Sequence, residues 1–456
     1  MSAVLLGAAL LFGCTCSGDA GEVQAVTGIE TPPEASECPS EPIPAERAPE
    51  VRPEHEDPEF WLAKLAPEAA DTPLLGADER GFLRERVAAL PGGWRDPLDE
   101  AVGDPELVAR ELRERIDWLR GRVSSGKYVE LEPGTLEQAA ARIEAAVPVE
   151  APNLHFVARE TQLWCVPASE GLFTEPVDRD FDRNYCASLH PGELVRALRR
   201  TPDDAWVYVD AGHSVGWIET QGGPLEPGIT AETARARLAP PRLYLTADYQ
   251  GLRHGSSFPL LGRDDQGFTI QVPGFEGPIE RVLPTDAPVS EAPWELTRRK
   301  LFTQAFAQLE QPYGWGGRAG HRDCSSYLLD LFALFDLRLP RNSAVQAELG
   351  TRSVDLSPLD EQAKRAAIRE AAQTGVVLLY MPGHILLYLG EDGGEDFGIS
   401  ALSEYLVPCP GGPDTIYKLD KVAVTTLELG RGTERRAFIE RISKMAVFGP
   451  GVANPP

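Results

Sequence analysis

The chain has 456 residues, of which 42% are hydrophobic and 25% are charged, and its formal net charge is −26 at pH 7. This length exceeds what one ordinary hydrophobic core organises, so we expect two to four domains. The negative charge would repel a phosphate backbone, which argues against nucleic-acid binding and against attachment to anionic lipid through a basic patch. No internal stretch of the sequence is long and apolar enough for a transmembrane helix.

The first residues predict an export signal with a lipid attachment site. Residues 4–13 (VLLGAALLFG) form a short apolar segment, typical of the core of a secretory signal, and Cys14 follows it. Residues 11–14 resemble a bacterial lipobox, in which the cysteine is lipidated and becomes the mature N-terminus, although the usual positive segment before the apolar run is missing. We therefore expect a signal over 1–14 and a periplasmic lipoprotein, with the outer membrane preferred because Thr15 gives no inner-membrane retention signal.

Residues 15–58 predict an extended tether. The segment is rich in Pro, Glu, Ala and Ser and has little apolar material to bury (IETPPEASECPSEPIPAERAPEVRPEHED). Such a composition favours disorder and would hold a folded body away from a membrane. Cys38 lies in this segment without an evident partner, and Cys409 in the distant sequence VPCPGG has no evident role.

Residues 59–150 predict a helical domain. Apolar residues recur at helical spacing and are mixed with pairs of Arg and Glu. The apolar faces consist of Phe60, Trp61, Leu62, Leu65, Leu107, Val108, Leu112, Ile116, Leu119 and Val123, and a further helix is expected over 136–146. Nothing in this region suggests catalysis, so we expect a packing unit.

From residue 151 the pattern changes to short strands between turn-rich segments, which predicts two small antiparallel barrels over 151–222 and 223–292. The sequence FDRNYCASLHPGELV…DDAWVYV…GWIET resembles a bacterial SH3-like barrel. Cys165 and Cys186 lie in the first barrel and could form a disulfide in an oxidising compartment, but their spacing alone leaves the pairing open.

Residues 293–450 predict an α+β domain built around Cys324. A Gly-rich turn (YGWGG) and then Asp323 precede the cysteine, and apolar residues at helical spacing follow it. Asp323 is a favoured N-cap residue, so Cys324 becomes the first residue of a helix, where free backbone N–H groups and the helix dipole favour the thiolate. The alternative is a small buried structural thiol. Further helices are expected over 294–308, 363–372 and 437–447, and a late strand over 416–425.

A thiolate nucleophile needs a base, and His384 is the one histidine downstream of Cys324. The stretch GVVLLYMPGHILLYLG predicts a hairpin in which a Pro-Gly turn precedes His384 at the start of the second strand. An imidazole there, facing a cysteine at a helix start, is a papain-like arrangement. The alternatives are a structural role for His384 in a turn and His321, on an expected loop, as the base.

The run PYGWGG…RDCSS…LPRNSAVQ, followed by MPGHILLYLG, resembles the NlpC-type bacterial cell-wall endopeptidases, papain-like cysteine peptidases that cut peptidoglycan stem peptides. The likeness is greatest to the subgroup with a helical N-terminal domain and two bacterial SH3-like barrels before an α+β papain-like catalytic domain. It implies that Cys324 is the nucleophile, that His384 is the base and that Tyr313 lies near the oxyanion. It also implies that Asp323 and Ser325 face the amino end of the substrate.

The family usually has a third polar residue, most often histidine, on the next strand. The matching position in DFGISALSEY is Ser400, and Ser403 and Glu404 are alternatives if the strand register differs. A serine hydroxyl accepts a hydrogen bond from the imidazole N–H, but it stabilises an imidazolium less than a histidine or a carboxylate does. We therefore expect an intact dyad of Cys324 and His384, and the identity of the third catalytic residue stays open.

The resemblance implies hydrolysis of the γ-D-glutamyl–diamino acid bond in stem peptides with a free N-terminal L-alanine, whose ammonium group Asp323 would bind. We expect a monomer without a cofactor, with stem peptides and a lipid anchor as its partners, and no metal site because the His and Cys residues are not clustered at ligand spacing. Two alternatives stay open. One is a cell-wall-binding lipoprotein with a catalytically impaired peptidase domain, and the other is a thiol amidase or acyltransferase on another substrate.

Overall fold

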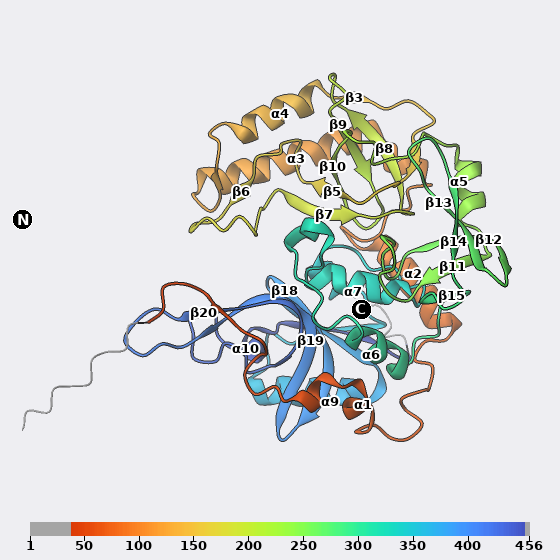
Figure 1. Cartoon of the computed structure of the whole chain (residues 1–456). Helices are drawn as coiled ribbons and strands as arrows, with labels where there is room; N and C mark the ends of the chain where they lie inside the picture. Colours follow the sequence, from red (N-terminus) through yellow and green to blue (C-terminus); the bar gives the residue numbers. More distant parts are fainter. Residues whose placement is uncertain (1–37, 452–456) are drawn as a thin grey trace, which may run out of the picture.

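The computed structural model describes residues 38–451, so the predicted signal with Cys14 and the first part of the predicted tether lie outside the described residues. Figure 1 shows a small sheet with two long helices at the top, a second small sheet at the right and a larger α+β unit below them. The predicted fold class, a multidomain chain with small β domains and an α+β domain, is confirmed. None of the helices in residues 38–451 has the length and apolar character that crossing a membrane requires.

The first β domain (residues 147–219) is a seven-stranded sheet on which two helices pack. Its strands are β3 Val147–Pro148, β4 Leu154–Phe156, β5 Thr161–Trp164, β7 Tyr185–Leu189, β8 Leu194–Arg200, β9 Trp206–Asp210 and β10 Val215–Glu219. The helices α3 Pro105–Ser124 and α4 Thr135–Ala145 bury their apolar faces against it, with Leu112, Ile116 and Trp217 in one core cluster. A disulfide joins Cys165 to Cys186. A separate two-stranded pair, β2 Val129–Glu130 with β6 Leu172–Phe173, lies beside this domain.

The second β domain (residues 231–290) is a five-stranded sheet with one short helix. Its elements are α5 Ala231–Leu238, β11 Arg242–Leu245, β12 Ser257–Asp264, β13 Gly267–Val272, β14 Ile279–Leu283 and β15 Val289–Ser290. Leu243, Phe258 and Ile270 lie in its core. It follows the first β domain in the chain and leads directly into the α+β domain.

The α+β domain is built on a seven-stranded sheet with the order β1-β20-β19-β18-β17-β21-β16. The strands that follow residue 350 are β16 Arg352–Asp355, β17 Val376–Met381, β18 His384–Asp392, β19 Glu395–Val407, β20 Thr415–Thr426 and β21 Lys444–Phe448. The helices are α6 Arg298–Phe306, α7 Cys324–Ala333, α8 Ser343–Gln346, α9 Glu361–Thr374 and α10 Phe438–Arg441. Helix α7 contacts β18 and β19 through fully buried side chains that include Tyr327, Leu328 and Leu331.

The predicted tether is wrong for residues 38–58, which dock on the α+β domain. Cys38 forms a disulfide with Cys409, and β1 Ile43–Pro44 adds a parallel edge strand to β20. The 3-10 helix η1 Pro53–Glu56 follows, and the His55 side chain is buried against Phe397. The cross-link and the strand pairing supply contacts that the Pro-rich composition does not reveal.

The helices predicted over 59–150 do not share one core. Helices α1 Pro58–Leu62 and α2 Ala77–Ala89 place Trp61, Leu83 and Val87 in the core of the α+β domain. Helices α3 and α4 belong instead to the first β domain. An amphipathic pattern shows that a helix has a buried face, but it does not say which core receives that face.

The helix predicted over 437–447 is also wrong, because only the single turn α10 is helical and β21 follows it. Strand β21 lies between β17 and β16 within the sheet and pairs with both. Pairing on both sides outweighs the local helical pattern.

Candidate active site

Helix α7 begins at Cys324, and Asp323 is its N-cap. The Asp323 carboxylate accepts a hydrogen bond from the Ser326 N–H at 3.0 Å, and the Ser326 hydroxyl accepts one from the Asp323 N–H at 2.9 Å. This reciprocal capping fixes the first turn and leaves the Cys324 N–H outside the helical hydrogen-bond ladder. The start of α7 therefore presents a thiol beside an unused backbone donor.

The base candidate comes from the hairpin of β17 and β18. Strand β18 begins at His384, and the N–H of the next residue, Ile385, donates a hydrogen bond to the Cys324 sulfur. The Nε2 atom of His384 lies 3.0 Å from the Oγ atom of Ser400 on β19. When Nε2–H donates to Ser400, Nδ1 carries the lone pair and can accept a thiol proton.

Burial sets the protonation of both groups. It raises the pKa of the Cys324 thiol to about 12, with the Asp323 carboxylate adding to the rise. It lowers the pKa of His384 to about 4, with Arg441 adding to the decrease. Each residue is only 8% exposed, and this burial favours the neutral thiol and the neutral imidazole. Burial thus opposes the thiolate that the helix start favours, whereas the N–H groups of Ile385 and Ser325 lower the pKa of the thiol.

The Asp323 side chain is occupied by donors of the protein itself. Its oxygens accept hydrogen bonds from the backbone N–H groups of Gly316 and Ser326 and from the hydroxyls of Ser325 and Ser326. The Arg341 guanidinium forms a buried ion pair with Asp323 and donates to the Ser325 hydroxyl at 2.6 Å. Arg341 holds the pKa of Asp323 below its ordinary value although burial opposes this. Asp323 and Ser325 are thus turned toward Arg341 in this structure.

Tyr313 lies beside the same group of residues. Burial raises the pKa of its phenol well above 10, and the nearby Asp323 and Cys324 raise it further. The hydroxyl therefore stays protonated and can donate a hydrogen bond.

The first β domain borders this site through the Gly-rich turn that precedes α7. The Trp315 indole donates to the Asp182 carbonyl at 2.9 Å, and the Arg183 guanidinium lies 4.5 Å from the Trp315 ring centroid. Gly316 has a φ of +61°, and a Cβ atom there would lie 2.5 Å from the Cβ atom of Tyr185 on β7. Glycine is required in this turn because the β7 backbone comes so close.

The other candidates have different surroundings. His321 follows the 3-10 helix η3 Trp315–Gly320 and interacts electrostatically with Glu160. The Ser403 hydroxyl donates to Asp420, and Glu404 pairs with Lys418 and Arg435. Ser400 is therefore the one of the three candidates for the third position that contacts the imidazole.

Arg341 is the site residue that the sequence interpretation missed. It lies in the run LPRNSAVQ, eighteen positions after Asp323. The available signal was indirect: an N-cap carboxylate at the start of a strongly apolar helix becomes buried and needs a counter-charge. Residues 38–451 contain no group of three His, Cys, Asp or Glu side chains arranged to hold a metal ion.

Comparison with known proteins agrees with this architecture. Residues 310–398 match the NlpC/P60 family, and residues 171–219 match the SH3 domain of the SH3b1 type. No curated protein matches the chain. Among solved structures, an NlpC/P60 endopeptidase from Photobacterium damselae subsp. piscicida is similar over 90% of this chain and 100% of its own, with a TM-score of 0.70 and 13% identity.

An NlpC/P60 family protein from Bacillus cereus ATCC 10987 is similar over 65% of this chain and all of its own, with 17% identity and a TM-score of 0.42. The Photobacterium structure, at 13% identity, supports the fold alone, and the family assignment comes from the two matched domains. Residues 310–398 are thus an NlpC/P60 domain, the domain of a cysteine peptidase family, in a multidomain chain that also contains an SH3 domain of the SH3b1 type.

Proposed function

We propose that this protein hydrolyses the γ-D-glutamyl–diamino acid bond of peptidoglycan stem peptides that have a free N-terminal L-alanine. The observation that carries the proposal is the arrangement at the start of α7. Cys324 is the first residue of the helix, and its sulfur accepts a hydrogen bond from the Ile385 N–H. The Ser400 hydroxyl contacts Nε2 of His384 and so orients the ring. The NlpC/P60 match over 310–398 supports a cell-wall peptide as the substrate class.

Because burial favours a neutral thiol and a neutral imidazole, the mechanism is one in which proton transfer accompanies attack. The Cys324 sulfur bonds to the scissile carbonyl carbon while its proton moves to Nδ1 of His384. The carbonyl oxygen becomes an oxyanion, for which the Cys324 N–H and the Tyr313 hydroxyl are the nearby donors. The imidazolium then gives its proton to the departing amine, and a thioester with Cys324 remains.

Hydrolysis of the thioester completes the cycle. His384 takes a proton from a water molecule as the water oxygen attacks the thioester carbonyl. The carbon–sulfur bond breaks, the new carboxyl group leaves, and the proton returns to the sulfur. Ser400 keeps Nδ1 directed at the reaction by accepting from Nε2–H throughout.

The amino end of the substrate is assigned to Asp323 and Ser325. A substrate ammonium group can bind Asp323 by sharing an oxygen with Arg341 or by taking its place, since the carboxylate already has five donors. The exchange keeps a positive charge beside a buried carboxylate, as buried carboxylates require. A substrate with an acetylated amino end lacks that charge.

A location outside the cytoplasm, with lipid on Cys14, is part of the same proposal. The pairs Cys38–Cys409 and Cys165–Cys186 support an oxidising compartment, in which such disulfides persist. Mass spectrometry of the mature chain would detect a diacylglycerol-modified cysteine at its N-terminus.

The test is incubation of the full chain with L-Ala-γ-D-Glu-diaminopimelate and with its N-acetylated form, followed by mass spectrometry of the products. We expect L-Ala-γ-D-Glu from the free peptide, far less cleavage of the acetylated one, and none with Cys324→Ala. The matched control is Asp265→Asn, an exposed residue between β12 and β13 away from both sites, which keeps activity. Binding without cleavage in the unmodified chain would favour a cell-wall-binding protein, and cleavage or transfer on other amides alone would favour the thiol amidase or acyltransferase.

A further inference from the structure

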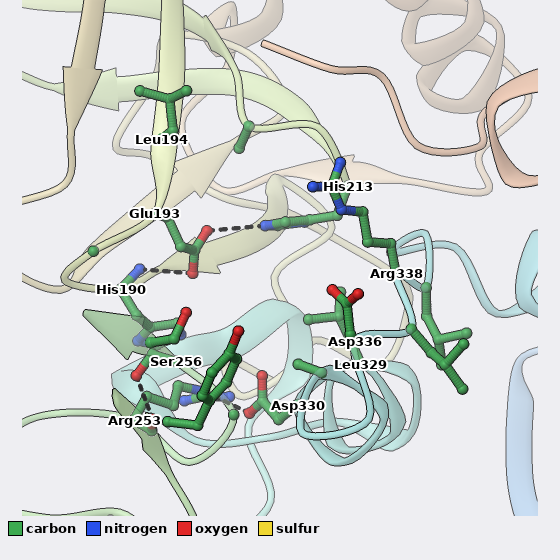
Figure 2. Close-up of a pocket in the computed structure, with 18 of the residues that line it drawn as sticks. His190, Glu193, Leu194, His213, Arg253, Ser256, Leu329, Asp330, Asp336 and Arg338 are labelled. Atoms are coloured by element: carbon green, nitrogen blue, oxygen red, sulfur yellow. Dashed lines mark hydrogen bonds and ion pairs between the residues drawn. The ribbon is translucent and has the colours of Figure 1, made fainter. Parts of the chain in front are cut away.

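A cavity of about 320 Å³ lies where the first β domain, the second β domain and the far end of α7 meet. Figure 2 shows Glu193 joined to His213, with Arg338 beside His213, and Arg253 and Asp330 below them. Neither residue of the dyad lines it. The size is in the range of small-molecule sites, and the contribution of three domains is typical of them.

The inner wall is fixed by compensated charges. Glu193 accepts from the N–H of His190 at 3.0 Å, and its other oxygen lies 3.1 Å from Nε2 of His213. Arg253 donates to Asp330 at 2.6 Å and to the Gly320 carbonyl at 2.6 Å. The contacts of Glu193 lie within the first β domain, whereas Arg253 joins the second β domain to the α+β domain, and none of these groups needs a ligand.

The rim carries two opposite charges that are not paired with each other. Asp336 and Arg338 are both exposed, and no ion pair joins either of them to another side chain in residues 38–451. The Arg338 guanidinium lies 5.2 Å from the ring centroid of Trp94, which fixes its position without neutralising its charge. Asp336 has a φ of +53° at the turn that ends α7, where the Leu337 N–H donates to the Phe332 carbonyl, and aspartate is among the residues that adopt this conformation.

Two buried polar atoms beside the rim also lack partners among residues 38–451. They are Nδ1 of His213, whose side chain is more than nine-tenths buried, and Nε1 of Trp94. When Nε2–H of His213 donates to Glu193, Nδ1 is an acceptor, whereas the Trp94 N–H is a donor. Unpartnered buried groups cost free energy, and a ligand that supplies one donor and one acceptor removes that cost.

We propose that this cavity binds a small zwitterion, a free amino acid or a short peptide with both ends unblocked. The ammonium group of the ligand pairs with Asp336, and its carboxylate pairs with Arg338 over the Trp94 ring. The proposal does not depend on the peptidase activity, because the site is separate from Cys324 and lies at the other end of α7.

The cavity has a direct structural link to the dyad. Arg338 and Arg341 lie in the same short segment after α7, and the Arg341 N–H donates to the carbonyl of His213 at 3.0 Å. The Arg341 side chain in turn holds Asp323, the N-cap of Cys324. A ligand that tightens the contact between His213 and this segment is therefore expected to alter substrate affinity, so we assign the site a regulatory role.

The test is calorimetric titration of the full-length Cys324→Ala chain with alanyl-alanine and with N-acetyl-alanyl-alanine amide. Alanyl-alanine is expected to bind with one-to-one stoichiometry, and the blocked peptide is expected not to bind. Arg338→Gln and Asp336→Asn should each weaken binding at least tenfold, and asparagine tolerates the backbone conformation of position 336. The controls are Arg113→Gln and Asp265→Asn, which change exposed residues away from the cavity and should leave binding unchanged.

Two results would overturn the site: no binding of alanyl-alanine, or binding that persists unchanged in both rim variants. Binding that is lost in Asp323→Asn and kept in Arg338→Gln would place the peptide in the active site instead. In the chain with Cys324 intact, saturating alanyl-alanine should change KM at least twofold, and this effect should disappear in Arg338→Gln. An inactive protein would refute the proposed function and leave the calorimetric result standing.

Discussion

The charged residues at the two ends of α7 differ in their burial and pairing. At its start, the Asp323 carboxylate accepts from five donors and is paired with Arg341 in the protein interior. At its end, Asp336 and Arg338 are exposed and no ion pair joins them to other side chains in the described part of the chain. The difference indicates that a ligand at the start must share Asp323 with Arg341 or displace it, whereas the charges at the end can pair with a ligand directly.

Removal of the nucleophile should cause the largest loss of activity among these variants. Cys324→Ala eliminates the sulfur that forms the proposed thioester, so turnover should fall by a factor of about 10⁴ or more. His384→Ala should cause a loss of similar order, because the two residues act as a unit. Turnover of the tripeptide, followed by chromatography, measures both effects. If Arg338→Gln lost as much activity as Cys324→Ala, the end of α7 would belong to the catalytic site and the comparison would fail.

Replacing one arginine at each end of α7 should show that the buried arginine stabilises the fold and that the exposed one does not. Arg341→Met leaves Asp323 buried without a counter-charge, which should lower the free energy of unfolding by roughly 3 to 5 kcal/mol. Arg338→Met, at the exposed rim, should change it by no more than about 0.5 kcal/mol. Urea unfolding monitored by circular dichroism gives both values. The double variant Asp323→Asn, Arg341→Met should recover part of the loss, and its failure to do so would show that Arg341 acts mainly through packing.

Stability should depend on pH through His384. Its pKa is about 4 in the folded chain and near 6.5 when unfolded, so between these values the unfolded chain binds the extra proton. The contribution of His384 is therefore complete above pH 6.5 and is lost as the pH falls toward 4. Between pH 7 and pH 4.5 the free energy of unfolding should decrease less in His384→Gln than in the unmodified chain, by roughly 1 to 3 kcal/mol. The control is His321→Gln, in a half-buried loop position, and an equal flattening there would refute the assignment.

The start of α7 was predictable because its determinants are local. An N-cap aspartate, a cysteine and an apolar pattern at helical spacing predict the helix start, and the Pro-Gly turn before His384 predicts the hairpin. The burial of the dyad was not predictable from these signals, because it comes from β18, β19 and α10, which lie far from Cys324 in the sequence. Arg341 was missed for the same reason, since its partner is defined by the fold.

The structure of the N-terminal region was not predictable from its local sequence. Composition predicted a tether over 15–58, but Cys38 and Cys409 pair across 371 positions and β1 joins the sheet edge. Helical periodicity over 59–150 identified buried faces correctly and did not reveal that α1 and α2 serve one core while α3 and α4 serve another. Long-range partners decide both outcomes, and a single sequence contains no local record of them.

Replacement of Ser400 should have the smallest effect on activity among these variants. The size of this effect shows how the imidazole is oriented. Its hydroxyl is neutral and contributes one ordinary hydrogen bond, worth about 1 to 1.5 kcal/mol, so Ser400→Ala should reduce kcat roughly tenfold with little change in KM. Ser403→Ala is the matched control on the same strand, since that hydroxyl donates to Asp420 and not to the imidazole. A loss approaching that of His384→Ala would show that the orientation of the ring, and not the charge of the third residue, limits catalysis. No loss at all would mean that burial between β18 and β19 orients the imidazole without Ser400.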